Sequence, residues 1–188
     1  MKKMIFSLVI MATVMSFVSQ AQNAITDFQK GTVVTASNEK LEGNIRDLSK
    51  NKGTIVFESA GKKKTYTPSE LSGFILNGNH YISYSGDFYK VIIPAGKAGL
   101  YQRVSDNSGK MMYNGAEAVL VSTAEGKPGD FYIQSLSDGK WSLVSQKNFE
   151  TVALNSFVDC PSVLAEIKTK QLDFAQLAKA VEHYNSCK

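Results

Sequence analysis

Signals for the common enzyme classes and metal sites are absent from this sequence of 188 residues. It has no G-x-S-x-G motif, which would place a serine nucleophile on a sharp turn. Zinc and calcium motifs are also missing, and the aspartates and glutamates are too scattered to indicate a catalytic carboxylate pair. The sequence therefore predicts no catalytic residue, no metal ligand and no cofactor.

Arginine is scarce, because all but two of the 21 basic residues are lysine. Only Arg46 and Arg103 carry the planar guanidinium that binds phosphates and carboxylates through two parallel hydrogen bonds. The formal net charge is +4, and it falls to about +2 without the first 21 residues, which hold two lysines and no acid. A chain this close to neutral does not favour a nucleic-acid partner.

A long, mainly apolar stretch, Met4–Val18, follows two lysines at the N-terminus. Ser19 and Ala21 come next, and small residues at these positions are typical of a signal peptide cleaved before Gln22. The run has about 15 residues, short of the roughly 20 that cross a bilayer, which favours cleavage over a retained membrane anchor. We therefore expect residues 1–21 to be a signal peptide and the protein to be periplasmic or extracellular. It should have no membrane span after cleavage, and it is not expected to be a lipoprotein, because no cysteine follows the run.

Residues 22–146 have the pattern of an antiparallel β domain. Short β-branched and aromatic runs recur with turn residues between them, and Asn77-Gly78-Asn79 is a strong hairpin signal. A glycine and three lysines at 61–64 indicate the tip of another hairpin. Strands of this length and spacing predict an antiparallel β sandwich or a barrel-like meander.

Residues 147–188 change to helical spacing and are expected to form a helical subdomain packed on the β domain. Pro161 suits the first position of a helix, where its missing N–H costs nothing. Asp173, with Gln176 three residues later, predicts a capping box at the start of the last helix. The predicted fold class is therefore α+β.

Cys160 and Cys187 are the two cysteines of the chain. In an exported protein such a pair most simply forms a disulfide, and the predicted helical hairpin brings both residues to the same end. Closing this loop should stabilise the fold by about 3–4 kcal/mol on the chain-entropy model. A redox or metal-binding pair is the alternative, but no C-x-x-C motif supports it.

Several segments together resemble exported proteins of Bacteroidetes-type bacteria. They are the run Gly61–Pro68 with Gly73-Phe74, and the tail motifs Asp159-Cys160-Pro161 and Tyr184-Asn185-Ser186-Cys187. The resemblance implies export and a disulfide-linked tail. It implies no activity, because none is established for that group.

Aromatic residues and one histidine are the candidates for a functional site in the β domain. Tyr81, Tyr84, Phe88 and Tyr89 cluster in the sequence and could form a ligand-contact face, although such residues also fill sheet cores. His80 could act as a general base if a carboxylate such as Asp87 oriented it.

The sequence favours a non-catalytic binding or scaffolding module of the cell envelope, with an unidentified ligand or protein partner. The alternative is an envelope hydrolase whose site assembles from distant residues, with His80 as its base. A purely structural role in an envelope assembly is a third reading. The oligomeric state is left open.

Overall fold

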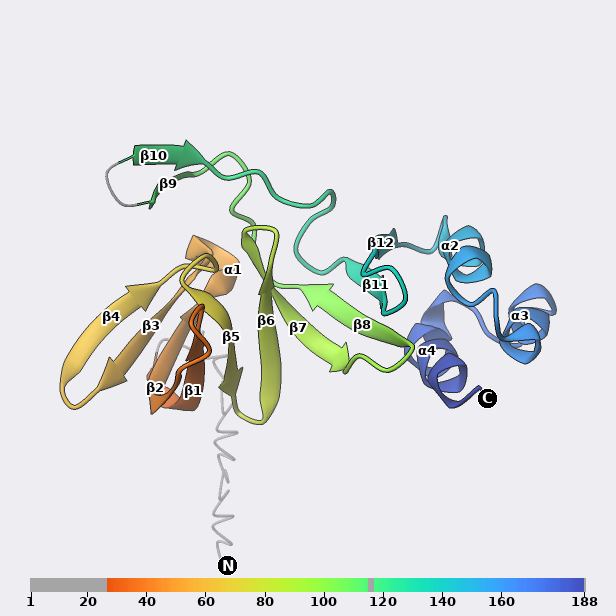
Figure 1. Ribbon diagram of the computed structural model, residues 1–188, viewed down its shortest axis with the longest axis horizontal. Helices are drawn as coiled ribbons and strands as arrows, with labels where there is room; N and C mark the ends of the chain where they lie inside the picture. The colour runs from red at the N-terminus through yellow and green to blue at the C-terminus, as the bar shows by residue number, and fades with distance from the viewer. Residues whose placement is uncertain (1–26, 115–116, 188) are drawn as a thin grey trace, which may run out of the picture.

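The computed structural model describes residues 27–114 and 117–187, so the predicted signal peptide lies outside the described residues (Figure 1). In chain order the strands are β1 (Gln29–Thr35), β2 (Lys40–Leu48), β3 (Thr54–Ser59), β4 (Lys62–Tyr66), β5 (Leu71–Leu76), β6 (Asn79–Tyr84), β7 (Asp87–Ile93), β8 (Ala98–Arg103), β9 (Met111–Asn114), β10 (Glu117–Leu120), β11 (Phe131–Ser135) and β12 (Trp141–Val144). The helical segments are α1 (Ser49–Lys52), α2 (Phe149–Ser156), α3 (Pro161–Lys168), the 3₁₀ turn η1 (Phe174–Gln176) and α4 (Leu177–Ser186).

Ten strands form one antiparallel sheet in the order β12-β11-β8-β7-β6-β5-β1-β2-β3-β4. The order has two ends, at β12 and β4, so the sheet is open. The predicted antiparallel, β-rich architecture with a C-terminal helical part is confirmed at this level. β9 and β10 form a separate hairpin that projects from the sheet (Figure 1), and it carries exposed apolar side chains at Met111, Val119 and Leu120.

Strand β7 contributes to two hydrophobic cores, because neighbouring residues of a strand point to opposite faces of the sheet. Phe88 is fully buried against β1, β2, β3 and β5, in a core with Val33, Ile45 and Phe74. Tyr89, also fully buried, points to the other face and packs with other aromatic residues. We call the side of Tyr89 the groove face and the side of Phe88 the helix face.

The sheet curls over the aromatic core of the groove face. Tyr84 on β6 and Trp141 on β12 are separated by three intervening strands, about 19 Å in a flat sheet. Their rings nevertheless stack, with centroids 4.1 Å apart and an interplanar angle of 10°. The C-terminal strands therefore bend toward the groove face and enclose Tyr89, Tyr101 and Tyr132.

The helices cover the helix face of the C-terminal strands. Leu100 on β8 and Ile133 on β11 lie in one buried cluster with residues of α2, α3 and α4 and of the loops between them. Phe174 of η1 packs against this cluster. Pro161 is the first residue of α3, as predicted. Asp173 and Gln176 form the predicted capping box, which opens the short turn η1 immediately before α4.

The predicted disulfide is confirmed, because Cys160 and Cys187 are bonded and join the start of α3 to the end of α4. Polar contacts reinforce this end. A hydrogen bond from Tyr184 is the largest cause of a lowered pKa at Asp159, and Lys97 lies 3.5 Å from the same carboxylate. Burial, followed by the contact with Asp159, raises the pKa of Tyr184 to about 12.

The three lysines predicted at a hairpin tip lie instead on strand β4, at one edge of the sheet. The turn is made by Ala60 and Gly61 alone, both with positive φ, and Lys62 already pairs with Ser59. A two-residue turn of this kind matches the twist of paired strands. Exposed lysines on an edge strand hinder pairing with another sheet, which gives the charges a structural role.

Asn185 fastens helix α4 to the sheet. Its side-chain amide accepts a hydrogen bond from the backbone N–H of Ala98 and donates one to the carbonyl of the same residue, both 2.8 Å long. The amide thus satisfies both backbone groups at the start of β8, as a neighbouring strand would.

We expect Asn185→Ala to destabilise the protein by about 1–3 kcal/mol, because the N–H of Ala98 loses the Asn185 acceptor and its carbonyl keeps only the 3.3 Å bond from the N–H of Gly96. Chemical denaturation measures the effect. Ser186→Ala is the matched control, because the hydroxyl of Ser186 bonds only within α4, to His183, and is exposed. Equal stability of the two variants would show that the Asn185 clamp contributes nothing.

Candidate ligand-binding groove

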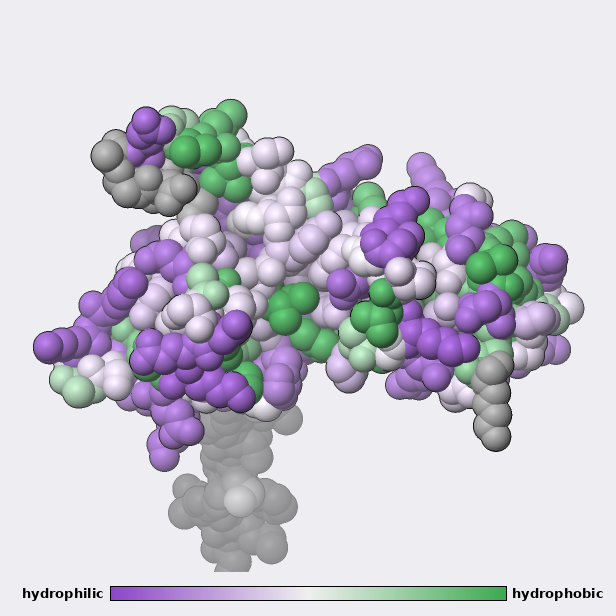
Figure 2. All heavy atoms as spheres, in the orientation of Figure 1, coloured by the Kyte–Doolittle hydropathy of each residue, from purple (hydrophilic) through white to green (hydrophobic). Residues whose placement is uncertain are grey.

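An apolar groove of about 740 Å³ lies over strands β1, β5, β6, β7 and β8 on the groove face. Its volume falls in the range of small-molecule sites. Half-buried aliphatic side chains and one tyrosine form most of its wall: Val34, Ile75, Ile82, Val91, Ile92 and Tyr101. Figure 2 shows hydrophobic side chains gathered near the middle of the molecule, over β6 and β7.

Two local features of the sequence open this groove. Gly73 pairs with Val34 on one side and Ile82 on the other, so the row of side chains across the sheet has a gap at that strand. A Cβ at Gly73 would overlap the carbonyl oxygen of Tyr81, so the close approach of β5 and β6 requires glycine there. The pairing of β7 with β8 shifts between Val91 and Ile93, and this bulge adds Ile92 to the groove wall.

The polar residues at the groove are Lys40, Ser72, Asn79 and His80. His80 is exposed on β6, opposite Ile75 of β5. Asp87, the carboxylate considered as its partner, lies opposite Tyr84 at the other end of β6, about 13 Å along the strand. The structure therefore does not bring His80 and Asp87 together.

The four aromatic residues considered as a contact face divide between the two faces of the sheet. Phe88 and Tyr89 are fully buried, one in each core. Tyr81 is half-buried, and its ring stacks on Phe74 at a centroid distance of 4.3 Å on the helix face. Tyr84 is the most exposed of the four, and its ring covers Trp141.

Arg103, at the end of β8, is the centre of a buried polar network that includes Asp87 at the start of β7. Its guanidinium donates to Oδ2 of Asp87 at 2.6 Å and to the carbonyls of Ala124 and Gly126 at 3.0 and 2.7 Å. A further bond, 3.0 Å long, goes from Nε to the carbonyl of Ser105. These bonds tie the long segment between β8 and β11 to the sheet.

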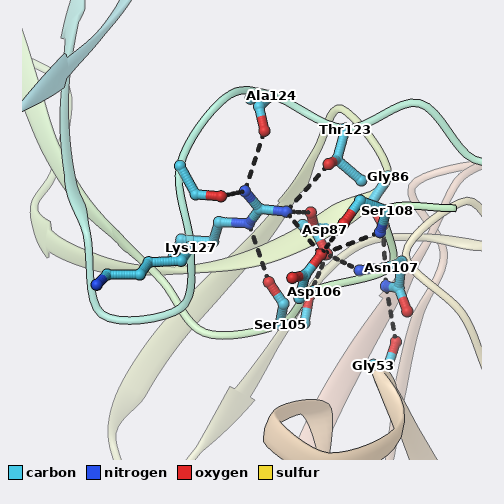
Figure 3. Close-up of polar contacts among 12 residues, drawn as sticks. Gly53, Gly86, Asp87, Ser105, Asp106, Asn107, Ser108, Thr123, Ala124 and Lys127 are labelled. Carbon is cyan, nitrogen blue, oxygen red and sulfur yellow. Dashed lines mark hydrogen bonds and ion pairs between the residues drawn. The ribbon is translucent and has the colours of Figure 1, made fainter.

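Asp87 is equally well bonded. Its Oδ1 accepts from the Ser105 hydroxyl at 2.8 Å and from the Asn107 backbone at 2.9 Å. Figure 3 shows these side chains converging on the carboxylate. Burial by itself would lower the pKa of Arg103, but the charge of Asp87 and the neighbouring tyrosines raise it. The arginine is therefore a permanently charged, fully bonded structural group, with no donor left for a ligand.

Sequence reasoning did not find the groove or the Arg103 network. Lys40 and Ile75 are ordinary strand residues in the sequence, and only the pairing of β1 with β5 brings them to one surface. Arg103 gave a weak signal, as one of two arginines in the chain and part of an alternating strand.

Within the described ranges, 27–114 and 117–187, no group of three or more potential ligands could hold a metal ion, and no helix is long and apolar enough to cross a membrane. Comparisons with protein-family models, curated proteins and solved structures find no match for the chain.

Proposed function

We propose that this chain is an exported binding module of the cell envelope, whose binding site is the apolar groove over β1 and β5–β8. The observation that carries the proposal is a row of half-buried aliphatic side chains around an open hollow. These aliphatic side chains are partly exposed to water, so an apolar ligand that covers them lowers the free energy of the system.

Export is supported by the Cys160–Cys187 disulfide, since disulfides persist in oxidising compartments. It is also supported by the signal-peptide pattern at residues 1–21 and by the resemblance of the tail to exported Bacteroidetes-type proteins. A scaffolding role in the envelope is compatible with the same fold, but it does not account for the hollow.

The hydrolase alternative retains one supporting observation, the position of His80 at the groove. A general base needs a group that orients its imidazole, and none of the described residues lining the groove is an aspartate or glutamate. Binding without catalysis therefore accounts for more of the site.

A neutral apolar dye, Nile red, tests the binding site. We expect the purified protein to bind the dye with a rise in fluorescence, and Ile75→Glu to weaken binding by about tenfold, because a charge then lies in the apolar wall. Ile75 lines the groove without belonging to any of the three buried clusters, so the substitution spares the cores.

Val158→Glu is the matched control, because Val158 is 71% exposed in the loop between α2 and α3 and does not line the groove. Circular dichroism confirms that both variants are folded. The proposal is wrong if the folded wild-type protein does not bind the dye, or if the two substitutions weaken binding equally.

A further inference from the structure

The groove lining contains basic side chains and no acidic side chain of the described residues. Lys40 and His80 belong to the lining, and no aspartate or glutamate of residues 27–114 and 117–187 does. Lys40 is exposed, and no ion pair within the described residues engages its ammonium group. An unpaired lysine beside an apolar hollow attracts a ligand that carries a negative charge.

The strand register places this charge at one end of the hollow. Lys40 of β2 lies opposite Val34 of β1, Val34 opposite Gly73 of β5, and Gly73 opposite Ile82 of β6. The residues on this line across the sheet therefore change from the ammonium group of Lys40, over the gap at Gly73, to the aliphatic side chain of Ile82.

The apolar part of the hollow continues beyond Ile82 to Val91 and Tyr101. Val34 on β1 and Tyr101 on β8 are four strand spacings apart, about 19 Å when measured over the curled surface of the sheet. The site is thus elongated, with its polar group at one end and its apolar surface along the rest.

Glu42 is the nearest acidic residue in the register on this face. It lies two positions beyond Lys40, opposite Thr32, and it lines a separate shallow depression with Lys30 and Asn44. No ion pair joins Glu42 to Lys40. The Lys40 charge therefore remains available to a ligand in the groove.

We propose that the groove binds a single-chain anionic amphiphile, such as a long-chain carboxylate, with its head group at Lys40 and its alkyl chain over Ile82 and Val91. This inference rests on the proposed function and adds the class of ligand. His80, on the strand next to Gly73, supplies a second donor at the side of the hollow.

Isothermal titration with dodecanoate, dodecanol and dodecylammonium tests the inference on the folded protein. We expect dodecanoate to bind more tightly than dodecanol, and dodecylammonium to bind least tightly. We expect Lys40→Glu to weaken dodecanoate binding about fivefold and to leave dodecanol binding unchanged, because only the charged head group senses the reversal.

Lys30→Glu is the matched control. It makes the same charge change at an exposed residue of β1 on the same face, outside the groove lining. Dodecanoate should bind this variant as it binds the wild-type protein.

The outcomes separate the ligand class from the proposed function. If dodecanol and dodecanoate bind equally, or if Lys40→Glu and Lys30→Glu weaken dodecanoate alike, the anionic class is wrong and the groove still binds an apolar ligand. If none of the three amphiphiles nor Nile red binds, the proposed function fails as well.

Discussion

Arg103→Met is expected to destabilise the protein by about 3–5 kcal/mol, the cost of leaving a buried charge without its partner. The Asp87 carboxylate, fully buried, would lose its guanidinium, and the carbonyls of Ala124 and Gly126 would lose their donors. Denaturation by urea measures the loss. Hydrogen exchange should show the segment between β8 and β11 opening first, because Arg103 holds that segment to the sheet.

A double-mutant cycle separates the ion pair from simple loss of packing. We expect Asp87→Asn to be destabilising alone, but to cost much less in the Arg103→Met background, since no unpaired charge is then buried. The other arginine, Arg46, gives the control: it is only half-buried, and Arg46→Met should cost far less. Additive effects of the two network substitutions would contradict the ion-pair account.

Removing the disulfide is expected to cost about 2–5 kcal/mol, because the reduced chain regains the entropy of an open loop. We propose the pair Cys160→Ala and Cys187→Ser, since Cys160 is fully buried and tolerates a small apolar residue best. The melting temperature should fall, and amide exchange in α3 and α4 should accelerate more than exchange in β7.

The reduced wild-type protein is the control for this pair of substitutions and should show the same loss. If the variant has the same melting temperature as the oxidised wild-type protein, the helical hairpin is held by packing alone. That packing is substantial, because Val163 and Ile167 of α3 and Val181 and Tyr184 of α4 all lie in the buried cluster under the helices.

The parts of the fold that depend on local sequence were predictable. Alternation in the strands, proline at the first position of α3 and the capping box at Asp173 are each encoded within a few residues. The disulfide was predictable for a different reason, since two cysteines allow one pairing.

The parts that depend on distant pairing were not predictable. β5 pairs with β1 as well as with its neighbour in the chain, β6. No residue pattern in β1 or β5 predicts the pairing between them. The groove is a product of that pairing, because Val34 and Ile75 belong to different segments. The four aromatic residues do not share one face for a similar reason: Phe88 and Tyr89 are neighbours along one strand, so they point to opposite sides of the sheet.

Strand β7 also constrains the order in which the chain can fold. Phe88 completes the core of the N-terminal strands, and Tyr89 belongs to the core of the C-terminal strands. The core of the N-terminal strands is therefore complete only when β7 has been synthesised, although β1 to β4 come much earlier in the chain. When β7 has paired with β6, it also contributes Tyr89 to the aromatic core that the later strands β8 and β11 complete. The strand thus belongs to the cores of both halves of the sheet, and neither core is complete without it.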